Sequence, residues 1–161
     1  MSELRGTPRA PGRRRVAVVV SRFNESVTIK LLAGARRCLR DKGVADGAVD
    51  VVWVPGAFEL PVAAEAAAAS GRYAAIVALG CVIRGETPHF EYVAGEATRG
   101  LGNVALAHRL PVGFGVLTTD SDEQAEARAG GAAGDKGYEA AEAALATADV
   151  LAQLSRAAPR D

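Results

Sequence analysis

The sequence of 161 residues has few cysteines and no excess of charge of either sign. Its two cysteines, Cys38 and Cys81, do not have the spacing of a metal-binding set. We expect them to be reduced thiols rather than a disulfide, which points to the cytoplasm. The 19 Lys and Arg residues balance 19 Asp and Glu residues, so the formal net charge is +0. A neutral chain gives no reason to expect nucleic acid or an anionic membrane as the main partner.

The sequence also has no long hydrophobic run near its N-terminus. The first apolar run, Val16 to Val20, follows an arginine-rich segment and is too short for a signal peptide core or a membrane span. Pro8, Pro11 and Gly12 lie in the segment before it. We therefore expect residues 1–14 to be a flexible arm. Residues 15–158 are expected to form a single domain, because no repeat or domain boundary is visible.

Four short apolar runs predict the strands of a sheet. They are rich in valine and apolar throughout rather than at alternate positions, which is typical of parallel strands buried on both faces. The runs are Arg15–Val20, Val49–Val54, Ala74–Ile83 and Val112–Leu117.

Helical patterns occur between and after these runs. The expected helices are Thr28–Leu39, Leu60–Ser70, His89–His108, Ser121–Ala129 and Tyr138–Ser155. Glycines at 95, 100 and 102 are expected to interrupt the third helix, and a capping box of Ser121 and Gln124 is expected to open the fourth. Alternating strands and helices predict an α/β fold, in which helices cover both faces of a parallel sheet.

Polar, aromatic or glycine residues follow each predicted strand. In open parallel α/β sheets, ligands bind outside the carboxyl ends of the strands, so we expect one site at that edge. The segments concerned are Ser21–Asn24, Pro55–Glu59, Cys81–Phe90 and Leu117–Asp120.

Phe23, Glu59 and His89 each have a functional and a structural interpretation. Phe23 could stack on a ligand ring, although a phenylalanine after a strand more often fills a core or an interface. If Glu59 is buried, it needs a ligand hydroxyl, a cation or a helix cap as its partner; otherwise it is a solvated residue at a helix start. His89 could transfer protons beside an anion site, or it could be a capping or exposed residue.

The segment Gly85–Thr87 precedes a predicted helix, whose first backbone N–H groups give a weak signal for an anion site, and no P-loop pattern is present. Arg128 could clamp a phosphate with its guanidinium, or interact with the end of its helix or with solvent. Lys136 is expected to be solvated, Phe114 to pack in the core and His108 to be structural. The residues alone indicate an anion-binding α/β protein with a candidate acid–base histidine.

Several motifs together resemble the lumazine synthase family. They occur in the order and spacing of the family from about Val16 to the last helix, and the ordered set is far more specific than any single motif. The matching segments are Ser21–Asn24, Pro55–Pro61, Gly80–Phe90, Gly115–Thr119 with Glu123–Ala125, Arg128–Gly130 and Asp135–Gly137. The resemblance implies a flavodoxin-like fold, a three-layer α/β/α sandwich with a central four-stranded parallel sheet.

The resemblance implies a transferase of riboflavin biosynthesis that needs no cofactor and no metal. Its small-molecule substrates are 5-amino-6-(D-ribitylamino)uracil and 3,4-dihydroxy-2-butanone 4-phosphate. The amine forms an imine with the ketone, phosphate is eliminated, and the ring closes with loss of water to give 6,7-dimethyl-8-ribityllumazine. Such a reaction needs orientation, proton transfer and a phosphate pocket more than a strong nucleophile.

By resemblance, the site residues fall into three groups. His89 is the proton donor and acceptor. The phosphate pocket consists of Gly85, Glu86, Thr87 and Arg128. The pyrimidine and its ribityl chain are bound by Phe23, Ala57, Phe58, Glu59, Cys81, Val82, Ile83, Phe114 and Lys136. In the family, the parts carried by Phe114 and Arg128 come from the neighbouring subunit, so a monomer would lack half of each site.

The resemblance also implies a homo-oligomer, either a pentamer or an icosahedral shell of sixty subunits. The short turn Arg128–Gly137 is similar to that of shell-forming members, although residues 131–133 lack a lysine that is frequent there and Asp135 replaces a frequent asparagine. Other interpretations stay open: a non-catalytic flavin- or lumazine-binding protein, or an inactive shell-forming protein, on the same fold. A nucleotide-binding flavodoxin-like module is supported only by the strand–helix alternation.

Overall fold

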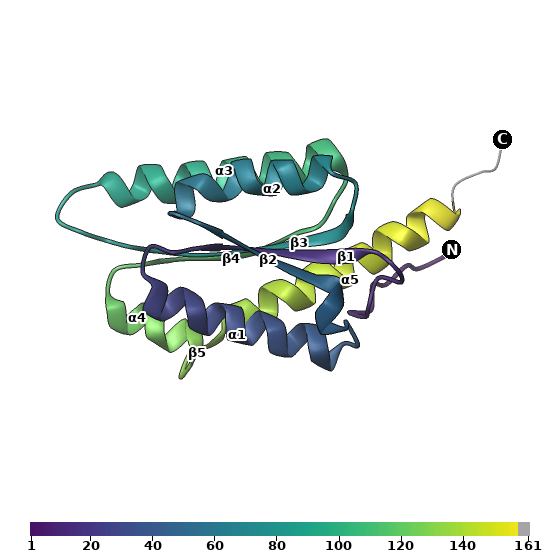
Figure 1. Ribbon diagram of the computed structural model, residues 1–161, viewed down its shortest axis with the longest axis horizontal. Helices are drawn as coiled ribbons and strands as arrows, with labels where there is room; N and C mark the ends of the chain where they lie inside the picture. The colour runs from purple at the N-terminus through teal and green to yellow at the C-terminus, as the bar shows by residue number, and fades with distance from the viewer. Residues whose placement is uncertain (158–161) are drawn as a thin grey trace.

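The valine-rich runs form a four-stranded sheet between two layers of helices (Figure 1). The computed structural model describes residues 1–157, so the predicted domain end at residue 158 lies outside the described residues. The strands are β1 (Arg15–Ser21), β2 (Val49–Val54), β3 (Tyr73–Ile83) and β4 (Val112–Thr119). They lie in the order β2-β1-β3-β4, and each neighbouring pair is parallel. The predicted three-layer α/β/α fold is confirmed.

Helices cover both faces of this sheet (Figure 1). One face carries α2 (Leu60–Ala69) and α3 (His89–His108), and the other carries α1 (Glu25–Asp41), α4 (Asp122–Arg128) and α5 (Lys136–Ala157). Short 3-10 helices, η1 (Asp46–Ala48) and η2 (Ala57–Glu59), lie on either side of β2 in the chain, and the hairpin strands β5 (Ala129–Gly131) and β6 (Gly134–Asp135) connect α4 to α5. Within residues 1–157, no helix has the length and apolar character needed to cross a membrane.

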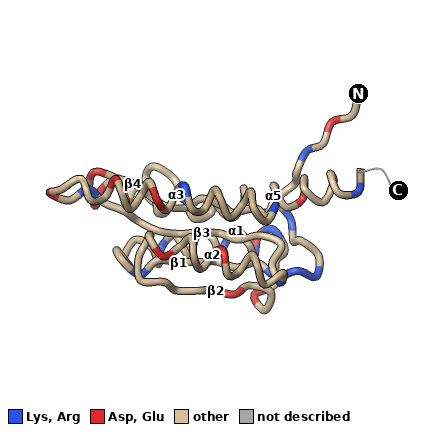
Figure 2. Tube along the Cα trace, turned by 90° about the horizontal axis from the view of Figure 1, so that it is seen from above, with Lys and Arg blue, Asp and Glu red and all other residues tan. Residues whose placement is uncertain are grey.

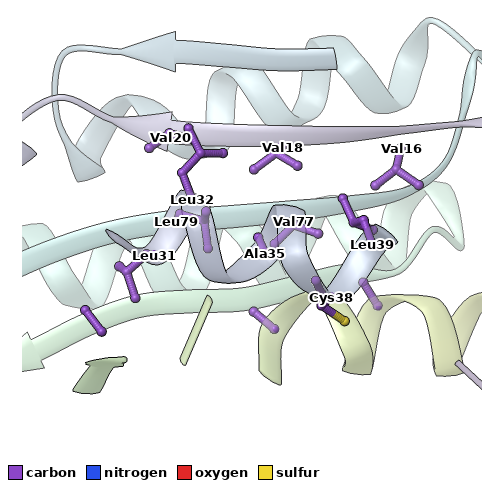
Figure 3. Close-up of a cluster of buried hydrophobic side chains, with 14 of the residues drawn as sticks. Val16, Val18, Val20, Leu31, Leu32, Ala35, Cys38, Leu39, Val77 and Leu79 are labelled. Carbon is purple, nitrogen blue, oxygen red and sulfur yellow. The ribbon is translucent and has the colours of Figure 1, made fainter. Parts of the chain in front are cut away.

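Strand β1 is buried by both helical layers, which explains its uninterrupted apolar sequence. Val16, Val18 and Val20 belong to the hydrophobic cluster that includes buried residues of α1 and α5 (Figure 3). Ala17 and Val19 belong to the opposite cluster, which includes buried residues of α2 and α3. Full burial of one valine contributes about 1.5–3 kcal/mol. The two-sided core therefore fixes the position of the strand.

Helix α3 is continuous through its three glycines, so the predicted interruption is wrong. At Gly100, a Cβ atom would lie 2.7 Å from Cβ and Cγ of Pro61 in α2. The glycine thus allows α2 and α3 to approach closely. Glycine costs a helix about 1 kcal/mol relative to alanine, and packing against the neighbouring helix outweighs this cost here.

The predicted capping box at the start of α4 is half present. The Ser121 Oγ accepts a hydrogen bond from the Gln124 N–H at 3.2 Å, which satisfies one free donor of the helix. The Gln124 side chain accepts from the Asp120 N–H at 2.8 Å, one residue earlier than a capping box requires.

Asp135 fixes the start of α5. Its Oδ1 accepts hydrogen bonds from the N–H groups of Gly137 (3.0 Å) and Tyr138 (3.1 Å), and its Oδ2 accepts one from Arg37 of α1 (3.0 Å). Because these bonds satisfy the first donors of the helix, α5 begins at Lys136, two residues before the predicted start.

The arm of residues 1–14 contacts the helices. The Thr7 N–H donates to Asp149 of α5 at 2.9 Å, and the Ala10 N–H donates to the Lys42 carbonyl at 3.1 Å. In Figures 1 and 2 the arm and the end of α5 lie at the same end of the molecule, away from the loop between β3 and α3.

A polar cluster joins three strands at the amino edge of the sheet. Asp50 of β2 accepts hydrogen bonds from the Arg15 Nε of β1 (2.7 Å) and the Tyr73 hydroxyl of β3 (2.8 Å). The bond from Arg15, followed by that from Tyr73, lowers the pKa of Asp50 to about 2. The carboxylate is therefore charged at neutral pH and links β2, β1 and β3 opposite to their carboxyl ends.

Gly137 is expected to resist substitution. A Cβ atom there would lie 2.0 Å from the Leu31 carbonyl oxygen of α1, so Gly137→Ala must push the two helices apart. We expect a loss of about 1–3 kcal/mol in the free energy of unfolding, measured by denaturant titration. Gly102→Ala, at an α3 position where a Cβ has no neighbour within 4 Å, is the control and should be neutral or slightly stabilising. Equal losses in the two variants would contradict the packing argument.

Candidate functional site at the carboxyl edge of the sheet

A cavity of about 220 Å³ lies at the carboxyl ends of β1, β2 and β3. The ends of these parallel strands meet at one edge of the sheet, so residues far apart in the sequence come together there. The cavity is lined by Phe23, Gly56, Ala57, Phe58, Glu59, Cys81, Val82, Ile83, His89, Phe90 and Val93. Eight of these are predicted site residues, and the prediction of one site at this edge is therefore consistent with the structure.

The turn after β1 presents Phe23 at the cavity. The side chain of Phe23 is 70% exposed, so it fills no core of this chain and leaves an aromatic surface free. The turn is held from the β2 side, because the N–H groups of Arg22 and Phe23 donate to the carbonyls of Val54 (2.8 Å) and Pro55 (3.0 Å). On the β3 side, the Asn24 side chain donates to the Cys81 carbonyl at 2.9 Å.

The segment after β2 forms the second wall. The Glu59 carboxylate is half-buried and accepts a hydrogen bond from the Gly56 N–H at 3.0 Å. Of the predicted partners for Glu59, the structure shows this local cap. Phe58 is 59% exposed beside it, and Ala57 is buried.

The end of β3 forms the floor of the cavity. Cys81 and Val82 are buried and Ile83 is half-buried. Burial raises the pKa of the Cys81 thiol to about 12, with smaller contributions from Asp122 and Glu126. The thiol is neutral at physiological pH, so it lines the cavity without the reactivity of a thiolate.

His89 lines the cavity from the first residue of α3, and its side chain is exposed. The loop before it, Gly85 to Thr87, is also exposed and does not line the cavity, although it leads directly to the N-terminus of α3. Arg84 anchors this loop: its guanidinium lies 4.3 Å from the centre of the Phe90 ring, and its Nε donates to Asp120 at 2.9 Å. A helix N-terminus with exposed backbone beside a histidine can bind an anion and exchange protons.

Besides the loop Gly85–Thr87, three more predicted site residues lie outside this cavity. Phe114 and Lys136 line a separate groove of about 830 Å³ along β4 and α5. Phe114 is 50% exposed, so the expectation that it packs in the core is wrong: β4 is an edge strand, and this side chain is not covered. Arg128 lies at the end of α4, where its Nη1 donates to the Gln124 carbonyl at 2.9 Å.

Gly56, Phe90 and Val93 also line the cavity and were not predicted from the sequence. Val93 follows His89 by four residues and therefore lies on the same face of α3, a signal that helical periodicity offered. Phe90 is 9% exposed and packs in the core as well as against the cavity. His108, expected to be structural, is paired with Glu65 of α2 at 2.8 Å. Within the described residues, no three His, Cys, Asp or Glu side chains are grouped so that they could hold a metal ion.

A parallel sheet covered on both faces, with a cavity at its carboxyl edge, is typical of α/β enzymes that act on small organic ligands. Comparison with known proteins identifies the family. The family of 6,7-dimethyl-8-ribityllumazine synthase matches residues 13–152. The 6,7-dimethyl-8-ribityllumazine synthase of Gemmatimonas aurantiaca is 56% identical over 159 residues, which cover 99% of this chain and 94% of that protein. The chain therefore belongs to the 6,7-dimethyl-8-ribityllumazine synthase family.

The predicted family is confirmed by these matches, and with it the class of enzyme, a transferase of riboflavin biosynthesis. The matched region includes all four strands of the sheet and every residue that lines the cavity. The roles of the individual residues stay predictions.

Proposed function

We propose that this chain forms 6,7-dimethyl-8-ribityllumazine at the carboxyl-edge cavity. The reaction is that of the family: 5-amino-6-(D-ribitylamino)uracil condenses with 3,4-dihydroxy-2-butanone 4-phosphate, and phosphate and water leave. One observation carries the proposal. Residues from three separate strand ends line a single cavity. By resemblance, one of them is the proton donor, His89, and others bind the aminouracil.

The cavity suits the flat ring of the aminouracil. Phe23 offers an exposed aromatic face, on which a heteroaromatic ring can stack. The buried backbone at Cys81 and Val82 can form hydrogen bonds with polar atoms at the edge of the ring through its N–H and carbonyl groups. The Glu59 carboxylate can accept hydrogen bonds from ribityl hydroxyls in addition to the Gly56 N–H, because each carboxylate oxygen has two lone pairs.

The phosphate of the second substrate is proposed to bind at the loop Gly85–Thr87. This loop is exposed and leads into the N-terminus of α3, where free backbone N–H groups and the helix dipole favour an anion. His89 lies between the loop and the cavity, so its imidazole can give a proton to the departing phosphate or take one from the amine. The binding of both substrates beside this histidine would supply most of the rate enhancement through orientation.

The predicted site residues that lie apart from the cavity, Phe114, Arg128 and Lys136, are proposed to act from a neighbouring chain. A cavity of about 220 Å³ falls below the range of roughly 300–1,000 Å³ that is usual for small-molecule sites. Phe114 and Lys136 lie in the other groove, and Leu106, 81% exposed, also lines it. An apolar groove of this size at an open strand edge is a surface that a second chain would cover.

The assembly is proposed to be a pentamer, further packed into a shell of sixty subunits. The turn between α4 and α5 supports the shell, because the hairpin of β5 and β6 is short and adds little bulk. Light scattering distinguishes the mass of a pentamer from that of a shell of sixty subunits.

The buried, unpaired thiols of Cys38 and Cys81 support the proposal that the enzyme is cytoplasmic.

His89→Ala is expected to slow turnover by about a hundredfold. General acid–base catalysis contributes about 10²–10⁴-fold, and the lower end applies because His89 is exposed and water can replace it in part. Lumazine absorbance after mixing both substrates measures kcat. His108→Ala, which removes only the pair with Glu65, is the control and should leave kcat unchanged. Unchanged turnover in the His89 variant would remove this residue from the mechanism.

Arg128→Ala is expected to raise the KM for the butanone phosphate by about tenfold or more. A guanidinium–phosphate interaction typically contributes about 1.5–3 kcal/mol, and the KM for the aminouracil should change little. Arg36→Ala, at an exposed position on α1, is the matched control. Normal saturation with the butanone phosphate in the Arg128 variant would contradict the assigned phosphate contact.

A further inference from the structure

Asn24 has an unusual backbone conformation for a residue with a side chain. Its φ is 59° and its ψ 46°, in the left-handed region, and within the described residues only one other non-glycine residue, Arg109, has a positive φ. Asparagine tolerates this region better than most residues, although glycine tolerates it best. The turn between β1 and α1 therefore holds an asparagine where backbone conformation alone would favour glycine. Some property of its side chain must explain its presence.

The side-chain amide of Asn24 makes a bond across the sheet edge. Its Nδ2 donates to the carbonyl oxygen of Cys81 at 2.9 Å, between residues 57 positions apart in the sequence. The backbone carbonyl of Asn24 accepts from the N–H groups of Val27 (3.0 Å) and Thr28 (3.1 Å), which starts α1. The side chain gives no cap to that helix, so its amide serves the contact with β3.

The two sides of the turn are held in different ways. Toward β2, the hydrogen bonds come from backbone N–H groups of Arg22 and Phe23, which any residue except proline would provide. Toward β3, the bond depends on the Asn24 amide and hence on the identity of the residue. Phe23, directly before Asn24, is thereby placed relative to the strand that forms the floor of the cavity.

We propose that Asn24 is a positioning residue that fixes the gap between the Phe23 ring and the backbone of Cys81–Ile83. This inference rests on the proposed function, in which the aminouracil ring lies in that gap. The bond from Asn24 also takes one of the two acceptor positions of the Cys81 carbonyl oxygen, so one position stays free for the ring. Asn24 touches neither substrate in this account and acts through Phe23 and Cys81.

Asn24→Gly tests the proposal, because glycine keeps the left-handed conformation and removes only the amide. We expect the KM for the aminouracil to rise about tenfold, because loss of the hydrogen bond to Cys81 leaves the Phe23 ring less well positioned for stacking. The KM for the butanone phosphate and the melting temperature should stay near their wild-type values. Asn24→Asp, which tolerates the same backbone and cannot donate, should show the same split. Asn103→Ala, at an exposed asparagine of α3, should change neither constant.

A second measurement needs no substrate. Hydrogen exchange of the ligand-free Asn24→Gly variant should be faster in the peptides that contain residues 21–24 and 81–83, and unchanged elsewhere. Unchanged exchange there, or equal increases in both KM values, would overturn the proposal and leave Asn24 with a general structural role. Failure of the proposed function would show differently. In that case Phe23→Ala would leave the KM for the aminouracil unaffected, while hydrogen exchange still reported on the contact between Asn24 and Cys81.

Discussion

The parallel hydrogen-bond ladder between β1 and its two neighbours is the constraint on which the rest of this structure depends. Parallel strands place all of their carboxyl ends at one edge, and the register from Val20 to Leu79 and Trp53 aligns the three ends that build the cavity. Burial of β1 on both faces makes this register costly to change. A shift by one residue would move Val18 and Val20 from one hydrophobic cluster toward the other.

The same alignment gives the two edges of the sheet different chemical roles. At the amino edge, Arg15, Asp50 and Tyr73 satisfy one another and link three strands. At the carboxyl edge, the aromatic ring of Phe23 is free, and His89 starts a helix beside exposed backbone. One edge therefore stabilises the sheet while the other keeps groups available for ligands. Phe114 and Lys136 lie in the groove along β4 and α5. In the proposed assembly, they reach the carboxyl-edge cavity of a neighbouring chain.

The strands and most of the residues that line the candidate cavity could be predicted because both depend on local patterns. Continuous apolar runs located β1 to within a residue, and residues just after strands turned out to line the cavity. The wrong predictions concern residues whose environment depends on contacts between distant parts of the chain, which the local sequence pattern does not contain. Gly100 looked like a break because its contact with Pro61 is distant in sequence, and Phe114 looked like core because the sequence does not say which strand lies at an edge. Arg128 lies at the end of α4, outside the cavity, and its proposed role depends on a contact between chains that a single sequence does not show.

The central claim is that each site is completed by a neighbouring subunit, and co-assembly of two defective chains tests it most directly. One chain carries Phe23→Ala and keeps Arg128, and the other carries Arg128→Ala and keeps Phe23. In an equal mixture that has been unfolded and reassembled, about one quarter of the interfaces in a ring pair two intact halves. The account predicts recovery of about one quarter of wild-type activity at low substrate concentration. Activity no higher than the mean of the two separate variants would show that each chain builds its site alone, and would contradict the account.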